Sequence, residues 1–409
     1  MKQLLLLICF PLQLLSQNTI GFPDIINYPK QVYKAGLQNW DVSQDKNGIV
    51  YFANNEGLLS FDGKYWNNYP LPNKTNVRSV AIGGDNRIYV GGQDELGYFS
   101  PAKNGRLNYF SLTEQIADKD RSFGDVWDIV SFKGNTYFRS ASKIFKFTDR
   151  CVSVFNAPSE WDYLGECNGK LYAHDNGGSL LTFENEVLAP VSTQNILPAN
   201  DPVTGIISIQ KDSAIISTLK NGLFFLCGSR ILKLQSVNDQ LFKNERIYAA
   251  TKVNKEWFAL ATSNNGIYII DLKGNIIQRF SRTEGLQNNN VLSIFLDRQS
   301  NLWLGLDNGI DLITYNSAIK QIKPMLQDGS GYNAIIHNSR LFLGTSNGLY
   351  SVPLQPTRDM SFNKGDFTAV NNTKGQLWGL ANINNQLLVG HHEGAFVIND
   401  NTANPISLN

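Results

Sequence analysis

The stretch from Phe280 to Tyr315 reads FSRTEGLQNNNVLSIFLDRQSNLWLGLDNGIDLITY and contains the pattern on which the chain is built. Residues 291–294 form a short apolar run, 297–301 a polar turn and 302–305 a second apolar run. The next turn, Asp307-Asn308-Gly309, has residue types that tolerate positive φ, and a third run follows it to Tyr315. Strand, turn, strand, turn and strand within about 25 residues predict an antiparallel meander.

The same pattern recurs, with a glycine at the opening of the third strand of each copy. These glycines are Gly57, Gly97, Gly178, Gly222, Gly266, Gly309, Gly348 and Gly394. They are 40, 81, 44, 44, 43, 39 and 46 residues apart, and the gap of 81 contains a degenerate copy near residues 137–145. This period predicts an all-β fold, a β-propeller of four-stranded antiparallel blades. A non-repetitive β-sandwich is the alternative, but it would require nine similar copies by coincidence.

The repeat count divides the chain. We expect residues 18–324 to form a seven-bladed propeller and 325–409 to form the first two blades of a second, incomplete propeller. One ring of eight or nine blades is the alternative. The segment from Phe22 to Tyr33 is expected to be a strand that completes the last blade, because closure removes open sheet edges. The polar connection 111–124 is expected to hold a short helix around residues 113–117.

The N-terminus predicts export. Met1-Lys2 is followed by an apolar run from Leu4 to Leu15 and a small-residue exit at Ser16-Gln17, as in a secretory signal peptide. We therefore expect residues 1–17 to be a signal peptide and the chain to be periplasmic. Three cysteines remain after this segment, and this odd number does not suggest a disulfide framework. The most plausible single pair is Cys151 with Cys167.

Composition excludes some classes of protein. The chain is 42% hydrophobic and 11% aromatic, which is enough for a large core, and its net charge is +1 with both signs scattered. A basic patch for nucleic acid is therefore not expected. The pairs Gly83-Gly84 and Gly91-Gly92 do not precede helices, so we expect no phosphate-binding loop and no cofactor.

No grouping of side chains indicates catalysis. His174-Asp175 occupies a turn position, as Asn54-Asn55 does in the first copy, so turn chemistry explains this pair better than acid–base catalysis. His391-His392-Glu393 also lies at a turn and lacks a third metal ligand, so we expect no metal site. Acids from different blades could cleave sugars together. The available acids fall at turn positions that the repeat explains: Asp41, Glu56, Asp94, Glu95, Asp125 and Asp162.

The corners where each first strand begins are better candidates for a binding site. In a propeller these corners surround the central channel on one face, and the rigid sheets leave their residues free to bind. Aromatic rings cover the apolar face of a sugar, and amides and acids pair with its hydroxyl groups. The candidate ligand-binding residues are Asn39, Trp40, Arg78, Asp125, Trp127, Tyr163, Asn290 and Tyr332. Alternatively, Trp40 and Trp127 are wedges between blades with a purely structural role.

The stretch from Phe280 to Ile310 resembles the two-component-regulator propeller repeat. In that repeat an aromatic residue is followed by T-x-x-D-G-L, an asparagine-rich corner and V-x-x-I-x-x-D-x-x-G-x-L-W-I-G-T-x-x-G-L. Here Glu284 stands in place of the usual aspartate, and Asn301 directly precedes the strand where a glycine is often found one place earlier. The stretch from Asp45 to Leu58 is a second similar copy. The resemblance covers nearly all of the chain after the signal peptide.

The resemblance implies the periplasmic sensor region of a hybrid two-component or triple-tyrosine regulator of the Bacteroidetes type. It implies recognition of a glycan-derived ligand, no enzyme activity in this region, and a histidine kinase or DNA-binding output beyond residue 409. The expected partners are an oligosaccharide, the downstream domains of the same membrane-anchored regulator, and a second copy in a homodimer. The alternatives are a secreted propeller enzyme, a polysaccharide lyase or hydrolase, and a structural propeller that docks a neighbouring protein.

Overall fold

The computed structural model describes residues 21–103, 105–148, 151–184, 187–192, 197–324, 329–354 and 367–406. The predicted signal peptide lies outside these residues. The described chain is all-β and forms four-stranded antiparallel sheets, which confirms the predicted fold class. It divides into two compact units. The larger is Asp24–Ser317, and the smaller comprises the described residues of Ala318–Asn409 together with residues 21–23.

Seven sheets make up the described part of the larger unit, and six of them are meanders of four consecutive strands. The first sheet contains β2 (Asn39–Gln44), β3 (Val50–Asn54), β4 (Gly57–Phe61) and β5 (Trp66–Tyr69), and the second contains β6 (Val77–Ile82), β7 (Ile88–Gly92), β8 (Glu95–Pro101) and β9 (Leu107–Ser111). The third contains β10 (Val126–Phe132), β11 (Asn135–Ser140), β12 (Lys143–Phe147) and β13 (Val152–Asn156), and the fourth contains β14 (Trp161–Cys167), β15 (Lys170–Asp175), β16 (Ser179–Glu184) and β17 (Val187–Pro190). The fifth contains β18 (Val203–Gln210), β19 (Ser213–Thr218), β20 (Gly222–Cys227) and β21 (Arg230–Lys233), and the sixth contains β22 (Ile247–Lys252), β23 (Trp257–Thr262), β24 (Ile267–Asp271) and β25 (Ile276–Phe280).

The seventh sheet combines the two ends of this unit. It contains β26 (Val291–Leu296), β27 (Leu302–Leu306) and β28 (Gly309–Ile313), and its fourth strand is β1 (Ile25–Tyr28). β1 pairs antiparallel with β28, as the sequence predicts for the segment before the first copy. The strand ends at Tyr28, earlier than expected. Pro29 begins the one-turn helix α1 (Lys30–Tyr33), which Lys34 ends in the left-handed conformation.

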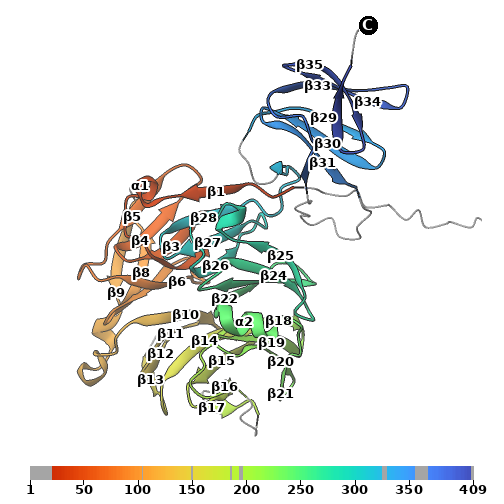
Figure 1. Cartoon of the computed structure of the whole chain (residues 1–409). Coiled ribbons are helices and arrows are strands. Elements are labelled where there is room, and N and C mark those ends of the chain that lie inside the picture. The colour runs from red at the N-terminus through yellow and green to blue at the C-terminus, as the bar shows by residue number, and fades with distance from the viewer. Residues whose placement is uncertain are drawn as a thin grey trace, which may run out of the picture. The chain divides into compact units, whose positions relative to one another are not determined.

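The inner strands close a ring. β2 contacts β6, β6 contacts β10, and the contacts continue through β14, β18, β22 and β26 back to β2. Figure 1 shows these sheets around a common centre, with β1 lying along β28. Each sheet therefore has a neighbouring sheet on both of its faces, which is the arrangement of a β-propeller.

Burial on both faces explains the apolar strands. All five residues of β3 are buried. Val50 and Phe52 pack on one side with Trp303, whereas Tyr51 and Ala53 pack on the other side with the strands of the second sheet. Successive strand residues point to opposite faces, so a sheet that is covered twice needs apolar residues at consecutive positions. Full burial of each such large side chain is worth roughly 1.5–3 kcal/mol.

The repeated motif has structural roles. Asp297 is buried, and its Oδ1 accepts hydrogen bonds from the amides of Gln299 and Asn301 at 2.9 and 2.7 Å, which closes the turn before β27. Its Oδ2 accepts a hydrogen bond from the Trp303 indole at 3.2 Å. Gly305 lies so close to the next inner strand that a Cβ would stand 2.4 Å from the carbonyl oxygen of Asn39. Only glycine permits this packing of neighbouring sheets.

One predicted glycine position is wrong. Gly97 does not open the third strand of its copy, because it lies inside β8 and has no positive φ. Asp94 takes the positive-φ position of that turn instead, with φ of 51°. Its carboxylate accepts hydrogen bonds from the amides of Phe123 and Gly124, both at 2.7 Å, so the side chain stabilises this corner.

The remaining elements are short. The described helices besides α1 are α2 (Asp239–Glu245) and the 3-10 turns η1 (Thr113–Gln115), η2 (Asp118–Asp120) and η3 (Arg282–Glu284). η1 confirms the short helix predicted in the connection 111–124. Within the described residues no helix has the length and apolar character needed to cross a membrane. Cys151, Cys167 and Cys227 are all free, so the predicted pairing of the first two is not present.

The smaller unit has two described four-stranded sheets. Their strands are β29 (Gly331–His337), β30 (Arg340–Thr345), β31 (Gly348–Pro353) and β32 (Thr368–Ala369), followed by β33 (Leu377–Ile383), β34 (Gln386–His391), β35 (Gly394–Asn399) and β36 (Thr402–Pro405). A core that includes Phe342, Leu377 and Val389 lies between them. That they begin a second propeller stays a prediction.

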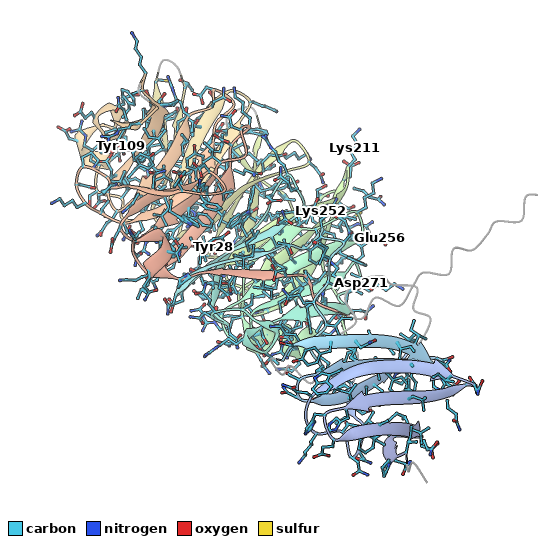
Figure 2. All side chains as sticks on the ribbon, turned by 90° about the horizontal axis from the view of Figure 1, so that it is seen from above. Tyr28, Tyr109, Lys211, Lys252, Glu256 and Asp271 are labelled. Carbon is cyan, nitrogen blue, oxygen red and sulfur yellow. The ribbon has the colours of Figure 1, made fainter. Side chains whose placement is uncertain are left out.

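Removing the Tyr28 ring is expected to weaken ring closure. Tyr28, labelled in Figure 2, lies 5.3–5.9 Å from the rings of Phe61, Trp66 and Trp303. We expect Tyr28→Ala to lower the free energy of unfolding by about 1–3 kcal/mol, because it removes these contacts and leaves a cavity. Urea denaturation measures this change. Tyr65→Ala is the control, since Tyr65 is 59% exposed. Equal effects of the two substitutions would contradict the role of Tyr28.

Candidate functional site

Each inner strand of the larger unit has a β-bulge at its second residue. The pairing register shifts there in all seven sheets, between residues 39/41, 77/79, 126/128, 161/163, 203/205, 247/249 and 291/293. A bulge leaves one residue without a partner and redirects its side chain. The residues at the seven bulges are Trp40, Arg78, Trp127, Asp162, Thr204, Tyr248 and Leu292.

The bulged residues surround one cavity. All seven line a space of about 500 Å³ at the inner strands. This volume is within the range of roughly 300–1,000 Å³ that is typical of small-molecule sites. Other lining residues come from the following strand positions and the adjoining loops: Asp41, Asp128, Arg139, Glu160, Tyr163 and Ser293 among them. The cavity is therefore built from every sheet of the ring.

Trp40, Arg78 and Trp127 form a cluster at this cavity. The Arg78 guanidinium lies 4.2 Å from the ring centroid of Trp40 and 5.1 Å from that of Trp127, within the range of cation–π contacts. The two indole rings are edge-on to each other with centroids 5.7 Å apart. Arg78 Nε donates to Asp125 Oδ2 at 3.2 Å. Four of the predicted ligand-binding residues are therefore brought together.

Asn55 fixes this cluster from the side. Its Oδ1 accepts a hydrogen bond from the Trp40 indole at 2.7 Å and a longer one from Arg78 Nη1 at 3.5 Å. The Arg78 side chain is 16% exposed. Its donors are only partly used by these contacts, so the guanidinium can still donate to a molecule in the cavity.

Two aspartates connect neighbouring inner strands. Asp41 Oδ2 accepts a hydrogen bond from the Val80 amide of the next sheet at 2.9 Å. Asp128 Oδ2 accepts a hydrogen bond from the Leu164 amide of the next sheet at 2.8 Å and another from Arg139 Nε at 2.8 Å. These carboxylates lie in the cavity wall and also hold the sheets together.

Three of the acids expected at turns lie in strands, and one of them is Glu95 in β8. Asp41 lies in β2 and Asp162 in β14, and both line the cavity. The sequence prediction was wrong here because the bulge adds a residue at the start of the strand. The strand therefore begins before the apolar pattern indicates.

Burial changes the acidity of these carboxyls. Burial raises the pKa of Asp41 from 3.8 to about 7, against hydrogen bonds from the Val80 and Val42 amides that lower it. Burial also raises the pKa of Asp162, and the hydrogen bond with His174 opposes this rise. At both positions, desolvation of the carboxylate raises the pKa more than the hydrogen bonds lower it.

The prediction that His174 occupies a turn is wrong. His174 lies in β15 with a side chain that is 0% exposed, and its Nδ1 is 2.6 Å from Asp162 Oδ1. The neighbouring Asp175 accepts a hydrogen bond from the Ser159 amide at 3.2 Å. The pair had looked like a turn because Asp175 ends the strand. A fully buried imidazole cannot reach a ligand directly, so His174 positions Asp162.

Two tyrosines add hydroxyl groups to the cavity wall. The Tyr163 hydroxyl oxygen accepts a hydrogen bond from the Ile206 amide of the next sheet at 3.2 Å, and burial raises its pKa. Burial also raises the pKa of Tyr248, and the charges of Arg78, Arg139 and Asp128 act on that phenol. Tyr248 comes from the sixth sheet, so its ring extends toward the second and third sheets.

The other predicted site residues lie elsewhere. Asn39 is fully buried and donates to the Gly309 carbonyl oxygen at 2.9 Å, so its role is structural. The Asn290 carbonyl oxygen accepts a hydrogen bond from the Asp307 amide at the same corner. Tyr332 belongs to the smaller unit, where it lines a cavity of about 400 Å³. The described residues contain no cluster of three or more His, Cys, Asp or Glu side chains that could hold a metal ion.

Several residues of the cavity were not among the ligand-binding residues predicted from the sequence. These are Asp128, Arg139, Thr204, Tyr248 and Leu292. Aligning the first strands of the seven copies by their bulge position would have identified Thr204, Tyr248 and Leu292. No pattern in the sequence indicates Arg139, because it comes from β11 and reaches the cavity through its pairing with Asp128.

The closed ring of four-stranded sheets defines a β-propeller protein. Residues 285–308 match the model of the family described as "Two component regulator propeller". The resemblance predicted from the sequence is therefore confirmed for this repeat, which runs from the end of η3 to the turn before β28. No curated protein matches the chain.

Solved structures share the fold at low sequence identity. One is the extracellular domain of a protein described as hybrid two component system BT3049 from B. thetaiotaomicron, with 18% identity and a TM-score of 0.65 over 93% of this chain and 53% of that one. The corresponding domain of BT4673 has 18% identity and a TM-score of 0.58 over 94% and 54%. The chain thus spans about half the length of these domains. Virginiamycin B lyase from Staphylococcus aureus has 14% identity and a TM-score of 0.55 over 71% and 97%.

The raised pKa of Asp41 predicts a pH-dependent stability. The folded state holds the Asp41 proton up to about pH 7, whereas the unfolded state loses it near pH 3.8. Between these values the folded state binds more protons, so this group lowers the free energy of unfolding as pH rises from 4 to 7. We expect Asp41→Asn to reduce this fall by about 1–3 kcal/mol, allowing for water in the cavity.

Urea denaturation at pH 4, 5.5 and 7 measures the effect. Asp212→Asn is the matched control, since Asp212 is exposed and outside the cavity. If the free energy of unfolding changes with pH to the same extent in Asp41→Asn and in the control, the assignment of the raised pKa to Asp41 is wrong.

Proposed function

We propose that this chain is the ligand-recognising propeller region of a periplasmic, membrane-anchored regulator of signal transduction or transcription. The ligand binds in the cavity of the larger unit. The observation that carries this proposal is the convergence of seven bulged residues, one from each sheet, on a single cavity of about 500 Å³. The repeat match at residues 285–308 and the shared fold of hybrid two component system domains support it.

A glycan-derived ligand fits the chemistry of this cavity. Trp40, Trp127 and Tyr248 offer flat rings for the apolar face of a sugar, and Arg78 and Thr204 offer polar groups for its hydroxyls. The output would lie in downstream domains of the same regulator, with the smaller unit as the start of a second propeller. Binding would then favour one of two arrangements of these parts, in the monomer or in a homodimer.

A polysaccharide lyase or hydrolase is the second candidate. Its support is the lyase fold among the similar structures and the presence of Asp41, Asp128 and Asp162 in one cavity. However, Asp41 accepts two backbone amides, Asp128 is paired with Arg139, and Asp162 is held by buried His174. Carboxylates engaged in this way are poorly placed to move a proton to a substrate, which favours recognition over turnover.

A thermal-shift screen against oligosaccharides tests the proposal. A ligand that binds only the folded state raises the melting temperature. We expect at least one oligosaccharide to do so and Trp127→Ala to weaken its binding about tenfold, which corresponds to roughly 1.4 kcal/mol. Tyr65→Ala is the aromatic control outside the cavity. The appearance of cleavage products in the same samples would instead support the enzyme, and undiminished binding by Trp127→Ala would exclude this cavity.

A further inference from the structure

The charges around the cavity are unbalanced. Its lining includes the four carboxyl groups of Asp41, Asp128, Glu160 and Asp162, but only the two guanidinium groups of Arg78 and Arg139. A cavity lined by excess charge of one sign attracts a ligand of the other sign, because field lines are focused between walls of low dielectric.

Both guanidinium groups are already neutralised. Arg139 contacts Asp128 through Nε and Nη2, both at 2.8 Å, and its Nη1 donates to the Trp161 carbonyl oxygen at 3.1 Å. Arg78 is paired with Asp125, which is not part of the cavity lining. The carboxyl groups of Asp41, Glu160 and Asp162 form no ion pair with an arginine or lysine within the described chain, and the charge of Arg139 acts on Asp162 from a greater distance.

Asp162 is the most informative of the three. Its side chain is only 9% exposed, and Oδ1 is engaged by His174. Oδ2 is buried, and it has no hydrogen-bond partner among the described residues. The Val203 amide is near enough to lower the pKa of this carboxyl, but it makes no hydrogen bond within normal distance. A buried carboxylate oxygen without a donor is costly, so the negative charge of Asp162 is poorly compensated at Oδ2 and favours a positive charge in the adjoining cavity.

The aromatic side of the cavity also suits a cation. The rings of Trp40 and Trp127 already hold the Arg78 guanidinium by their faces. The Tyr248 ring lies in the same wall, where the charges of Arg78 and Arg139 act on its phenol. Carboxylates combined with aromatic faces are the usual surroundings of a bound ammonium group.

Resting on the function proposed above, we infer that the ligand is an amino sugar with a free, protonated amino group. The ammonium group lies beside Glu160 and Asp162, and the sugar ring lies against the aromatic rings of the cavity. An N-acetylated sugar lacks the charge, and an acidic sugar would be repelled by the excess of carboxyl groups in the lining.

Proton binding competes with such a ligand. The titratable and charged groups around Asp162 are Asp41, Asp128, Glu160, Tyr163, His174, Tyr248, Arg78 and Arg139. Because burial raises the pKa of Asp41 to about 7, the Asp41 carboxyl group is mostly protonated in mildly acidic solution. An ammonium ligand needs ionised carboxyl groups and a protonated amino group of its own, so its affinity should increase as pH rises from 5.5 to 7.0. The affinity of an acidic ligand should decrease over the same interval.

Isothermal titration with matched disaccharides tests the inference. The probes are the β-1,4-linked glucosamine dimer, its di-N-acetylated form and a galacturonic acid dimer, each measured at pH 5.5 and 7.0. We expect the glucosamine dimer to bind at least tenfold more tightly than the acetylated dimer at pH 7.0. Equal or tighter binding of either other probe, or no binding of the glucosamine dimer, overturns the inference. Binding of the neutral or acidic dimer leaves the proposed sensor function intact.

Two variants locate the charge that matters. Asp162→Asn keeps an oxygen for His174 but removes the charge, and Glu160→Gln changes an exposed side chain on which the fold does not depend. Each should reduce the preference for the glucosamine dimer, about tenfold for Asp162→Asn and severalfold for Glu160→Gln. Glu256→Gln, at an exposed turn outside the cavity (labelled in Figure 2), should leave the preference unchanged. An unchanged preference in both cavity variants would overturn the inference.

Discussion

β1 hydrogen-bonds along β28, and this pairing joins the first residues of the larger unit to its last strand. Thr314 continues the connection, since its amide and hydroxyl both donate to the Asp24 carbonyl oxygen, at 2.9 and 3.1 Å. Each sheet of the ring is covered on both faces, so an open ring would expose apolar surface on two sheets and a free edge on one. The aromatic contacts of Tyr28 with Phe61, Trp66 and Trp303 add packing to the same junction.

The centre of the ring has a second set of connections. Ser79 Oγ donates to the Val126 carbonyl oxygen at 2.8 Å, and Asp41, Asp128 and Tyr163 each accept an amide from the next inner strand. These residues all follow the bulge by one position. The bulged residues themselves make fewer such connections and face the cavity. The bulge thus separates the residues that hold the ring from those available to a ligand.

This separation explains why recognition fits the site better than chemistry. The cavity contains carboxyl groups, but Asp41, Asp128 and Asp162 have structural partners, and the neighbouring His174 is fully buried. A rigid ring with adaptable residues at one position per sheet can change its ligand by substitution at those positions, without loss of the fold. On the inference made above, the excess of carboxyl groups over guanidinium groups sets the charge of the preferred ligand.

The sequence by itself determined the repeat, the strand order and the role of the first strand. These features are local, because turn residues such as Asp297 and runs such as β3 carry their own signals of period and burial. It also indicated the corners at which Trp40, Arg78 and Trp127 meet. Only the tertiary structure decided which residues share the cavity. The bulges shift the strand starts, Asn39 turns inward to bond Gly309, and Arg139 and His174 act through partners from other strands. Such contacts depend on how neighbouring sheets pack, and no spacing along one strand contains that information.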